Sequence, residues 1–205
     1  MLDKSLKEFS LMTSSKDPIP GGGGVTALVG SLASSLSQMV TNLTIGKKTY
    51  MQYTDELISI RKEADILRLN LLDCINKDAE AFKPLAEAYS IPKDTPGYEQ
   101  TMQECLKNAA ESPMLILKYC TRIIDLDERL AVIGSKISVS DAATSVMLAH
   151  AGLYGAYVNI LVNTRLMKDK DLAEAMNKEA VDLLDEYSVK ALNVYDDICK
   201  RLTDD

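Results

Sequence analysis

The 205-residue sequence has no tryptophan, only two phenylalanines and a single histidine. A buried core must therefore come from Leu, Ile, Val, Ala and Met. The lone histidine, His150, excludes a metal site built from several histidines. It lies among Leu148, Ala149 and Ala151 in a helical pattern, so a packed histidine is a better interpretation than a member of a catalytic triad.

Closely spaced cysteines are also missing. The four cysteines are far apart and form no C-x-x-C pair, so a zinc site is not indicated. Each lies beside apolar residues in a helical pattern, and we expect buried, unreactive thiols at Cys74, Cys105, Cys120 and Cys199.

Positive charge is in short supply. With 23 Lys and Arg against 30 Asp and Glu, the net charge is −7, which argues against a nucleic-acid-binding surface. Charged residues interrupt residues 1–20, so no signal peptide is expected. No apolar run approaches the ~20 residues of a membrane span. We therefore expect a cytoplasmic protein with neither nucleic acid nor membrane as a partner.

Strand patterns are absent, because no stretch alternates apolar and polar residues between hairpin turns. Apolar residues instead recur at spacings of three and four. They predict helices over residues 2–12, 25–45, 57–85, 98–130, 140–166 and 170–202. We expect Pro84 to bend its helix and Pro113 to kink or split its own. The prediction is an all-α bundle of five or six long helices in one domain, residues 1–205.

Two of these helices, 25–45 and 141–163, are rich in Ala, Gly and Ser. They should approach their neighbours most closely, and either could form a subunit interface.

A glycine run precedes the first of these helices. Glycine loses much backbone freedom on ordering, so we expect a loop up to Gly24 and a helix from about Val25. The amides of Gly21, Gly22, Gly23 and Gly24 would lie at a helix N-terminus, where anions are favoured. The run lacks the spacing of a phosphate loop, and no strand precedes it. A flexible loop before a close-packed helix is the alternative interpretation.

Two acidic residues stand out. Asp78 replaces a hydrophobe on the apolar stripe of the third helix, so its carboxylate must be ion-paired, hydrogen-bonded to backbone, protonated or pocket-lining. Asp141 follows Ser138 at capping-box spacing, which predicts the start of a helix.

Further polar side chains lie near helix ends and faces. Lys47 and Lys48 follow a helix, where the dipole favours cations, so solvated caps are one interpretation. Asn159 and Asn163 lie four residues apart on one helix face, from which they could bond to a neighbouring helix.

Six blocks of sequence resemble the cyclodeaminase/cyclohydrolase family, which includes the cyclodeaminase domain of formiminotransferase-cyclodeaminase and stand-alone methenyltetrahydrofolate cyclohydrolases. The blocks span nearly the whole chain, and the first is the most specific. They are residues 20–30 (PGGGGVTALVG), 43–50 (LTIGKKTY), 78–82 (DAEAF), 91–93 (IPK), 138–141 (SVSD) and 155–163 (GAYVNILVN).

The resemblance implies hydrolysis of 5,10-methenyltetrahydrofolate to formyltetrahydrofolate. The alternatives are a formiminotetrahydrofolate cyclodeaminase that releases ammonia and a non-catalytic folate-binding helical dimer. The two reactions need a proton moved at neutral pH, and neither needs a metal or a redox cofactor. The resemblance also implies a homodimer or higher homo-oligomer.

The resemblance further implies the site residues. Asp78 and Asp141 are expected to be catalytic in one pocket, one holding charge and one relaying a proton. The expected substrate-binding residues are Gly21, Gly22, Gly23, Gly24, Lys47, Lys48, Tyr50 and Ser140, with the lysines suited to the carboxylates of a folate tail. The sequence departs from the family at residues 134–137, where Gly-Ser-Lys-Ile replaces Gly-Asn-x-Asn, and this departure favours the non-catalytic alternative.

Overall fold

The computed structural model describes residues 1–204, which contain six α-helices, two short 3₁₀ helices and no strand. The prediction of an all-α bundle is therefore confirmed. The elements are α1 (Leu6–Thr13), α2 (Gly22–Thr44), η1 (Lys48–Tyr53), α3 (Thr54–Tyr89), α4 (Tyr98–Ile133), η2 (Lys136–Ser138), α5 (Val139–Thr164) and α6 (Lys170–Asp204).

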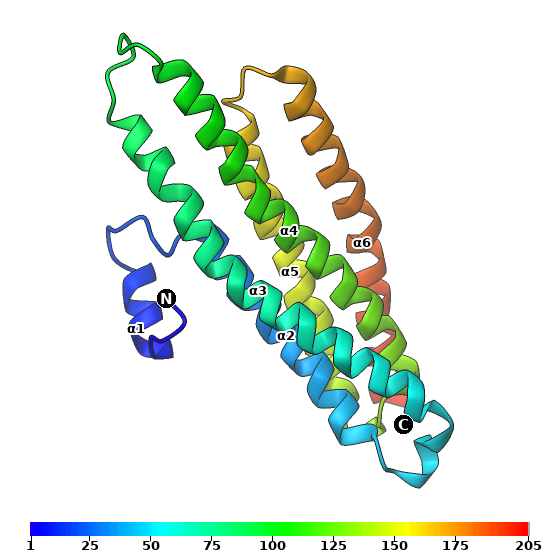
Figure 1. The fold of residues 1–205 in the computed structure, drawn as a ribbon. Coiled ribbons are helices and arrows are strands. Elements are labelled where there is room, and N and C mark those ends of the chain that lie inside the picture. The colour runs from blue at the N-terminus through cyan, green and yellow to red at the C-terminus, as the bar shows by residue number, and fades with distance from the viewer. Residues whose placement is uncertain (205) are drawn as a thin grey trace.

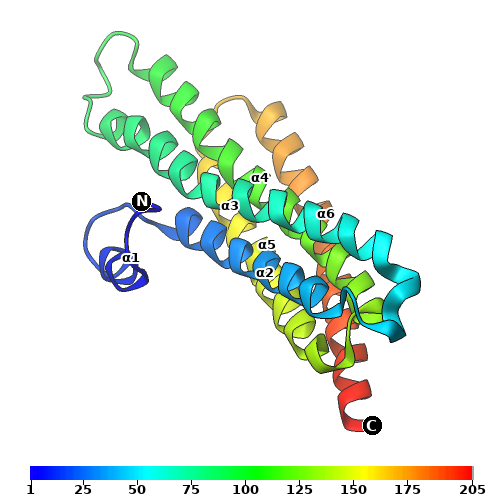
Figure 2. The same ribbon diagram turned by 60° about the horizontal axis from the view of Figure 1, so that its bottom comes forward.

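Helices α2 to α6 run alternately up and down, and α5 packs against α2, α4 and α6 (Figures 1 and 2). We call the end of the bundle where α2 begins, and where the loop between α5 and α6 lies, the glycine end. The opposite end, which holds η1 and η2, is the lysine end. At 1.5 Å per residue, α2 is about 34 Å long and α3 and α4 about 54 Å each. The hairpin of α3 and α4 therefore extends past the first residue of α2 (Figure 1).

Small residues bring α2 and α5 close to their neighbours, as predicted. A Cβ added to Gly155 of α5 would lie 2.5 Å from Thr26 Oγ1 of α2, and one added to Gly152 would lie 2.6 Å from Cys120 Sγ of α4. Both distances are shorter than any normal contact, so a side chain at either glycine would push the helices apart.

Several helix boundaries differ from the prediction: α1 begins at Leu6 instead of residue 2, and α3 spans Thr54–Tyr89 instead of 57–85. Two further differences have an identifiable structural cause. Helix α2 begins at Gly22, within the glycine run that was expected to be loop. Helix α4 continues through Pro113, so the predicted split is wrong. Pro113 has no N–H to donate to the carbonyl of Ala109, four residues earlier. That carbonyl instead accepts a hydrogen bond from Asn163 Nδ2 of α5 at 3.2 Å.

The predicted burial of the cysteines is confirmed for Cys74, Cys105 and Cys120, while Cys199 is half-buried. Burial raises the pKa of Cys74 to about 11 and that of Cys120 to about 12, which keeps these thiols protonated and unreactive.

A fully buried aspartate, Asp127, lies where α2, α4 and α5 meet. Its Oδ1 accepts a hydrogen bond from Ser37 Oγ at 2.7 Å, and Ser145 Oγ lies 3.0 Å from that hydroxyl. Its Oδ2 has no partner among the described residues. Burial, opposed by the serine hydrogen bonds, raises the pKa of Asp127 to about 8, so the carboxyl group is protonated at neutral pH.

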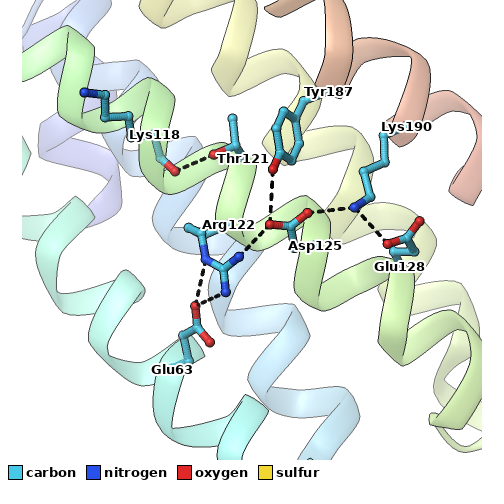
Figure 3. A network of polar contacts seen from close by, with 8 residues as sticks. All are labelled: Glu63, Lys118, Thr121, Arg122, Asp125, Glu128, Tyr187 and Lys190. Atoms are coloured by element: carbon cyan, nitrogen blue, oxygen red, sulfur yellow. Dashed lines mark hydrogen bonds and ion pairs between the residues drawn. The ribbon is translucent and has the colours of Figure 1, made fainter. Parts of the chain in front are cut away.

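A second polar network joins α3, α4 and α6 at the surface (Figure 3). Asp125 of α4 accepts hydrogen bonds from Arg122, Lys190 and Tyr187. Arg122 also pairs with Glu63 of α3. Burial alone would lower the pKa of Lys190, but its bonds to Asp125 and Glu128 outweigh burial and raise that pKa.

Helix α5 is unusually apolar. Residues 136–164 are long and apolar enough to cross a membrane by length and composition, contrary to the expectation that no run in the sequence approaches such a span. In the bundle this segment is a central helix packed against three others. Only 39% of its most apolar 18-residue stretch is buried, so part of its apolar face is not covered by the other helices.

Candidate functional site

A cavity of about 250 Å³ opens at the glycine end, between the start of α2 and the facing parts of α3, α4 and α5. Asp78 is the one charged side chain in its lining. The other lining residues are Pro18, Ile19, Gly21, Gly22, Gly23, Phe82, Ala109, Asn159, Val162 and Asn163.

The glycine run makes room for polar side chains from two other helices. A Cβ on Gly23 would lie 2.1 Å from Asp78 Oδ1, and a Cβ on Gly22 would lie 3.3 Å from Asn159 Nδ2. The backbone N–H of Gly24 donates a hydrogen bond to the Asp78 carboxylate. The predicted anion at this helix N-terminus is therefore matched by Asp78 of the same chain.

This contact explains why α2 starts earlier than predicted. The N-cap residue of α2 is Gly21, which has no side chain to cap the helix. Asp78 supplies an acceptor for a first-turn amide that would otherwise be unpaired. The tertiary hydrogen bond offsets the entropic cost of ordering the glycines, which local sequence cannot reveal.

Asp78 is half-buried and has two opposing influences on its acidity. Desolvation raises its pKa, while the hydrogen bond from Gly24 works against the rise. The net result is a raised pKa. A carboxylate in this position is more basic than one in water, which suits it to accept a proton.

Two asparagines of α5 complete the polar lining. Asn159 Nδ2 donates to Gly155 O at 2.7 Å. Asn163 Nδ2 donates to Ala109 O at 3.2 Å and to Asn159 O at 2.9 Å. The expected bond to a neighbouring helix is therefore confirmed for Asn163, whereas Asn159 bonds within its own helix.

The other predicted catalytic residue, Asp141, lies elsewhere. It is half-buried in the first turn of α5, at the lysine end. Eighteen residues separate it from Asn159, which corresponds to roughly 27 Å along the helix. Within one protomer, Asp78 and Asp141 therefore do not share the cavity, and the expectation that they meet there is wrong for a single chain.

The predicted capping box at Asp141 is also not formed. The N-cap residue Ser138 makes no side-chain cap. Its hydroxyl donates instead to Ser135 O at 3.1 Å, because η2 turns the buried serine toward the preceding loop.

The remaining predicted substrate-binding residues are at the lysine end. Lys47 Nζ donates to Ser135 Oγ at 2.7 Å, and the N–H of Lys136 donates to Tyr50 Oη at 3.1 Å. These bonds hold the loop between α4 and α5. Lys48 is exposed.

Two further cavities lie at the lysine end. Tyr50 lines one of about 540 Å³, together with Lys136 and Arg201. Ser140 lines another of about 570 Å³ beside Tyr195. The residues of the predicted site thus form two groups, with the glycines and Asp78 at one end of the bundle and the lysines, Tyr50, Ser140 and Asp141 at the other.

Sequence reasoning missed the apolar walls of the small cavity, Ile19, Phe82 and Val162. Phe82 follows Asp78 by four residues on the same helix face, and this spacing was the available signal. Ile19 has no such signal, since its place depends on how residues 1–20 fold back.

The fold and the cavity define a helical-bundle protein that can hold a small molecule against one shielded carboxylate. The family model described as Formiminotransferase-cyclodeaminase matches residues 5–182. The chain belongs to this family.

Relatives of established name agree with this assignment. The chain is 34% identical over 204 residues to the methenyltetrahydrofolate cyclohydrolase of Methylorubrum extorquens, with 98% of each sequence covered. It is 27% identical over 195 residues to the formimidoyltransferase-cyclodeaminase of Mus musculus. That match covers 93% of this chain and 36% of the mouse protein, so the chain spans about a third of the longer relative.

A solved structure shares the fold. The crystal structure of formiminotetrahydrofolate cyclodeaminase from Thermotoga maritima matches with a TM-score of 0.83 and 33% identity, covering 97% of this chain and 96% of the other.

Proposed function

We propose that this protein is a folate one-carbon enzyme that hydrolyses 5,10-methenyltetrahydrofolate to formyltetrahydrofolate. The full-length similarity to the Methylorubrum cyclohydrolase supports the substrate. The observation that carries the proposal is the Asp78 carboxylate, held by the Gly24 amide at the wall of a small cavity.

The reaction needs one base and one water molecule. The methenyl carbon of the substrate is flanked by two nitrogens that share a positive charge. Water attacks this carbon, a C–O bond forms, and Asp78 accepts the proton that the water loses. The hydroxyl group of the adduct then loses its proton to solvent as a C=O bond forms and one C–N bond breaks, and the freed nitrogen takes the proton held by Asp78. A positioned acid–base group of this kind typically contributes ~10²–10⁴-fold to the rate.

The size of the cavity suits one part of the substrate. Pockets that enclose a drug-sized ligand are usually about 300–1,000 Å³, and this one is about 250 Å³. We therefore place the bicyclic ring and its one-carbon bridge inside, with the aminobenzoyl-glutamate tail outside. The proposed enzyme uses its folate as substrate, requires no metal or redox cofactor and acts in the cytoplasm.

A second candidate is a formiminotetrahydrofolate cyclodeaminase, favoured by the 33% identity to the Thermotoga protein of that name. Its substrate closes on itself and expels ammonia. A third candidate, a folate-binding dimer without activity, is favoured by Ser135 and Ile137 in place of the family asparagines.

An assay of the purified chain separates these candidates. Hydrolysis predicts loss of methenyltetrahydrofolate absorbance above the rate without enzyme. The cyclodeaminase predicts ammonia release from formiminotetrahydrofolate. Folate binding without either turnover would overturn the proposed activity and support the third candidate.

We further propose that the protein forms a homodimer through the outer faces of α2 and α5. Large apolar side chains are exposed on both helices, including Leu32 at 48%, Tyr154 at 49% and Val158 at 60%. A two-fold axis across these helices would pair them antiparallel. The glycine end of one protomer would then lie beside the lysine end of its partner, and Asp141 could serve the partner's Asp78.

Mixed dimers test this shared site. Asp78→Asn and Asp141→Asn should each be inactive alone. Random mixing of equal amounts should restore about a quarter of wild-type activity, because half the dimers then carry one intact site of two. An Asp141→Asn protein with full activity, or mixed dimers as inactive as their parents, would overturn the shared site.

A further inference from the structure

The asparagine pair of α5 has a fixed orientation that leaves its oxygens available. The Nδ2 groups of Asn159 and Asn163 are the atoms that donate to helix carbonyls, so the assignment of oxygen and nitrogen follows from the bonding partners. Neither Oδ1 accepts a hydrogen bond from any of the described residues 1–204. Neither is fully buried, because neither is among the buried polar atoms that lack a partner.

Pro113 of α4 fixes Asn163 in particular. A proline has no N–H, so the carbonyl of Ala109, four residues earlier, lacks its normal helical donor. Asn163, which is only 8% exposed, fills that vacancy with Nδ2. Turning the amide over would place an oxygen against a carbonyl oxygen, so the orientation with Oδ1 away from α4 is enforced.

The residues that line the cavity therefore offer three side-chain acceptor groups, the Asp78 carboxylate and the two carboxamide oxygens. Asn159 also has its Nδ2 beside Gly22, where an added Cβ would lie 3.3 Å from Nδ2 and 3.6 Å from Oδ1. The two carboxamide oxygens have no donor in residues 1–204 and are not sealed from solvent, so a ligand that supplies N–H groups can form hydrogen bonds with them in this partly desolvated site. Apolar side chains such as Phe82 and Val162 complete the lining and suit a flat ring.

Building on the function proposed above, we infer that Asn159 and Asn163 select the aminopyrimidinone ring of the folate by accepting its ring N–H and exocyclic amino hydrogens. This contact leaves Asp78 free to act at the one-carbon bridge. Asn163 is also a positioning residue, because its own amide is set by the carbonyl that Pro113 exposes.

The inference is tested by comparing two ligands on four proteins. The ligands are 5-formyltetrahydrofolate, which is stable under the assay, and its analogue with methyl in place of the 2-amino group. Titration calorimetry gives the ratio of their dissociation constants for the wild type, Asn159→Ala, Asn163→Ala and the control Val162→Ala. Val162→Ala changes the same cavity without removing a polar atom.

The wild type should bind the amino ligand about tenfold more tightly than the analogue, the effect of about one hydrogen bond. Each asparagine variant should bring the ratio below threefold, roughly the effect left when half that bond's contribution is lost. Val162→Ala should weaken both ligands equally and keep the wild-type ratio. Thermal unfolding of each variant confirms that it is folded at the assay temperature.

Two results would overturn the inference, and they differ in scope. An unchanged ratio in folded Asn159→Ala and Asn163→Ala, with normal hydrolysis by the wild type, removes this recognition role alone. A wild type that binds neither ligand removes the proposed function with it.

Discussion

Gly23 and Asp78 lie on different helices, yet each explains the residue type of the other. The space that a Cβ on Gly23 would fill already holds Asp78 Oδ1, at 2.1 Å. The sequence marks both residues as unusual, through a glycine run and a carboxylate on an apolar stripe. It cannot show that they touch, because 55 positions separate them along the chain.

Gly23→Ala should therefore displace the carboxylate. We expect a loss of turnover of at least tenfold and a destabilisation of about 1–3 kcal/mol, as for overpacking elsewhere. The neighbouring Gly24→Ala is the control, since its Cβ would meet Pro20 Cβ at an ordinary 3.4 Å. It should stabilise the helix by up to about 1 kcal/mol. Urea unfolding checks both, and equal effects at the two positions would contradict the steric account.

Asp127 gives a prediction for pH. Its pKa is about 8 in the folded protein and near the ordinary 3.8 in the unfolded chain. Between these values the folded state holds a proton that the unfolded state has lost. The contribution to stability is thus complete below about pH 4, falls as pH rises and is gone above about pH 8.

Asp127→Asn should remove that contribution. The free energy of unfolding of the variant, relative to wild type, should therefore increase steadily from pH 5 to pH 8. Chemical denaturation at several pH values measures this difference. The exposed Asp185→Asn is the matched control and should show no such trend. A parallel pH dependence for Asp127→Asn and wild type would show that Asp127 is not buried in its neutral form.

At the scale of single elements, apolar periodicity predicted the five long helices within a few residues. The errors arose where another element supplied a bonding partner. Asp78 lets α2 begin among glycines, and Asn163 lets α4 continue through Pro113. Ser138 fails to cap α5 because its hydroxyl reaches Ser135 O. Local sequence determines which backbone groups need partners but not which distant side chain provides them.

The bond between α4 and α5 can be tested with a double-mutant cycle on Pro113 and Asn163. Asn163→Ala leaves the buried Ala109 carbonyl without a donor and should cost about 1–3 kcal/mol. In a Pro113→Ala background the backbone N–H of position 113 supplies that donor. The same Asn163→Ala change should then cost about 1 kcal/mol less. Additive effects in urea unfolding would show that the two residues are not coupled through this carbonyl.

At the scale of the whole molecule, the up-and-down order of the helices decides which motifs meet. Helix α3 returns Asp78 to the start of α2, because 24 residues of rise, about 36 Å, match the length of α2. Helix α4 then carries the chain back to the lysine end, where Asp141 begins α5. Helix lengths visible in the sequence could have placed Asp141 at that end. The expectation that it shares a pocket with Asp78 came instead from the family resemblance of residues 138–141.

The charged network around Asp125 should contribute to global stability, because it joins three helices (Figure 3). Asp125→Asn weakens bonds to Arg122, Lys190 and Tyr187 and should cost about 1–2 kcal/mol. The control is Lys118→Gln, which removes a pair to Glu179 that is nearly half exposed. That change should cost less than about 1 kcal/mol. Thermal unfolding at low and high salt compares them, and equal costs would contradict a special role for the network.

The central claim is that the Asp78 carboxylate performs the acid–base step in the cavity at the glycine end. The most direct test is steady-state hydrolysis of 5,10-methenyltetrahydrofolate by Asp78→Asn, a change that preserves shape and the acceptor for Gly24. We predict a fall in kcat of about 10²–10⁴-fold at an unchanged unfolding temperature. A folded variant with kcat within about threefold of wild type would contradict the claim, since so small a change lies far below the effect of a lost general base.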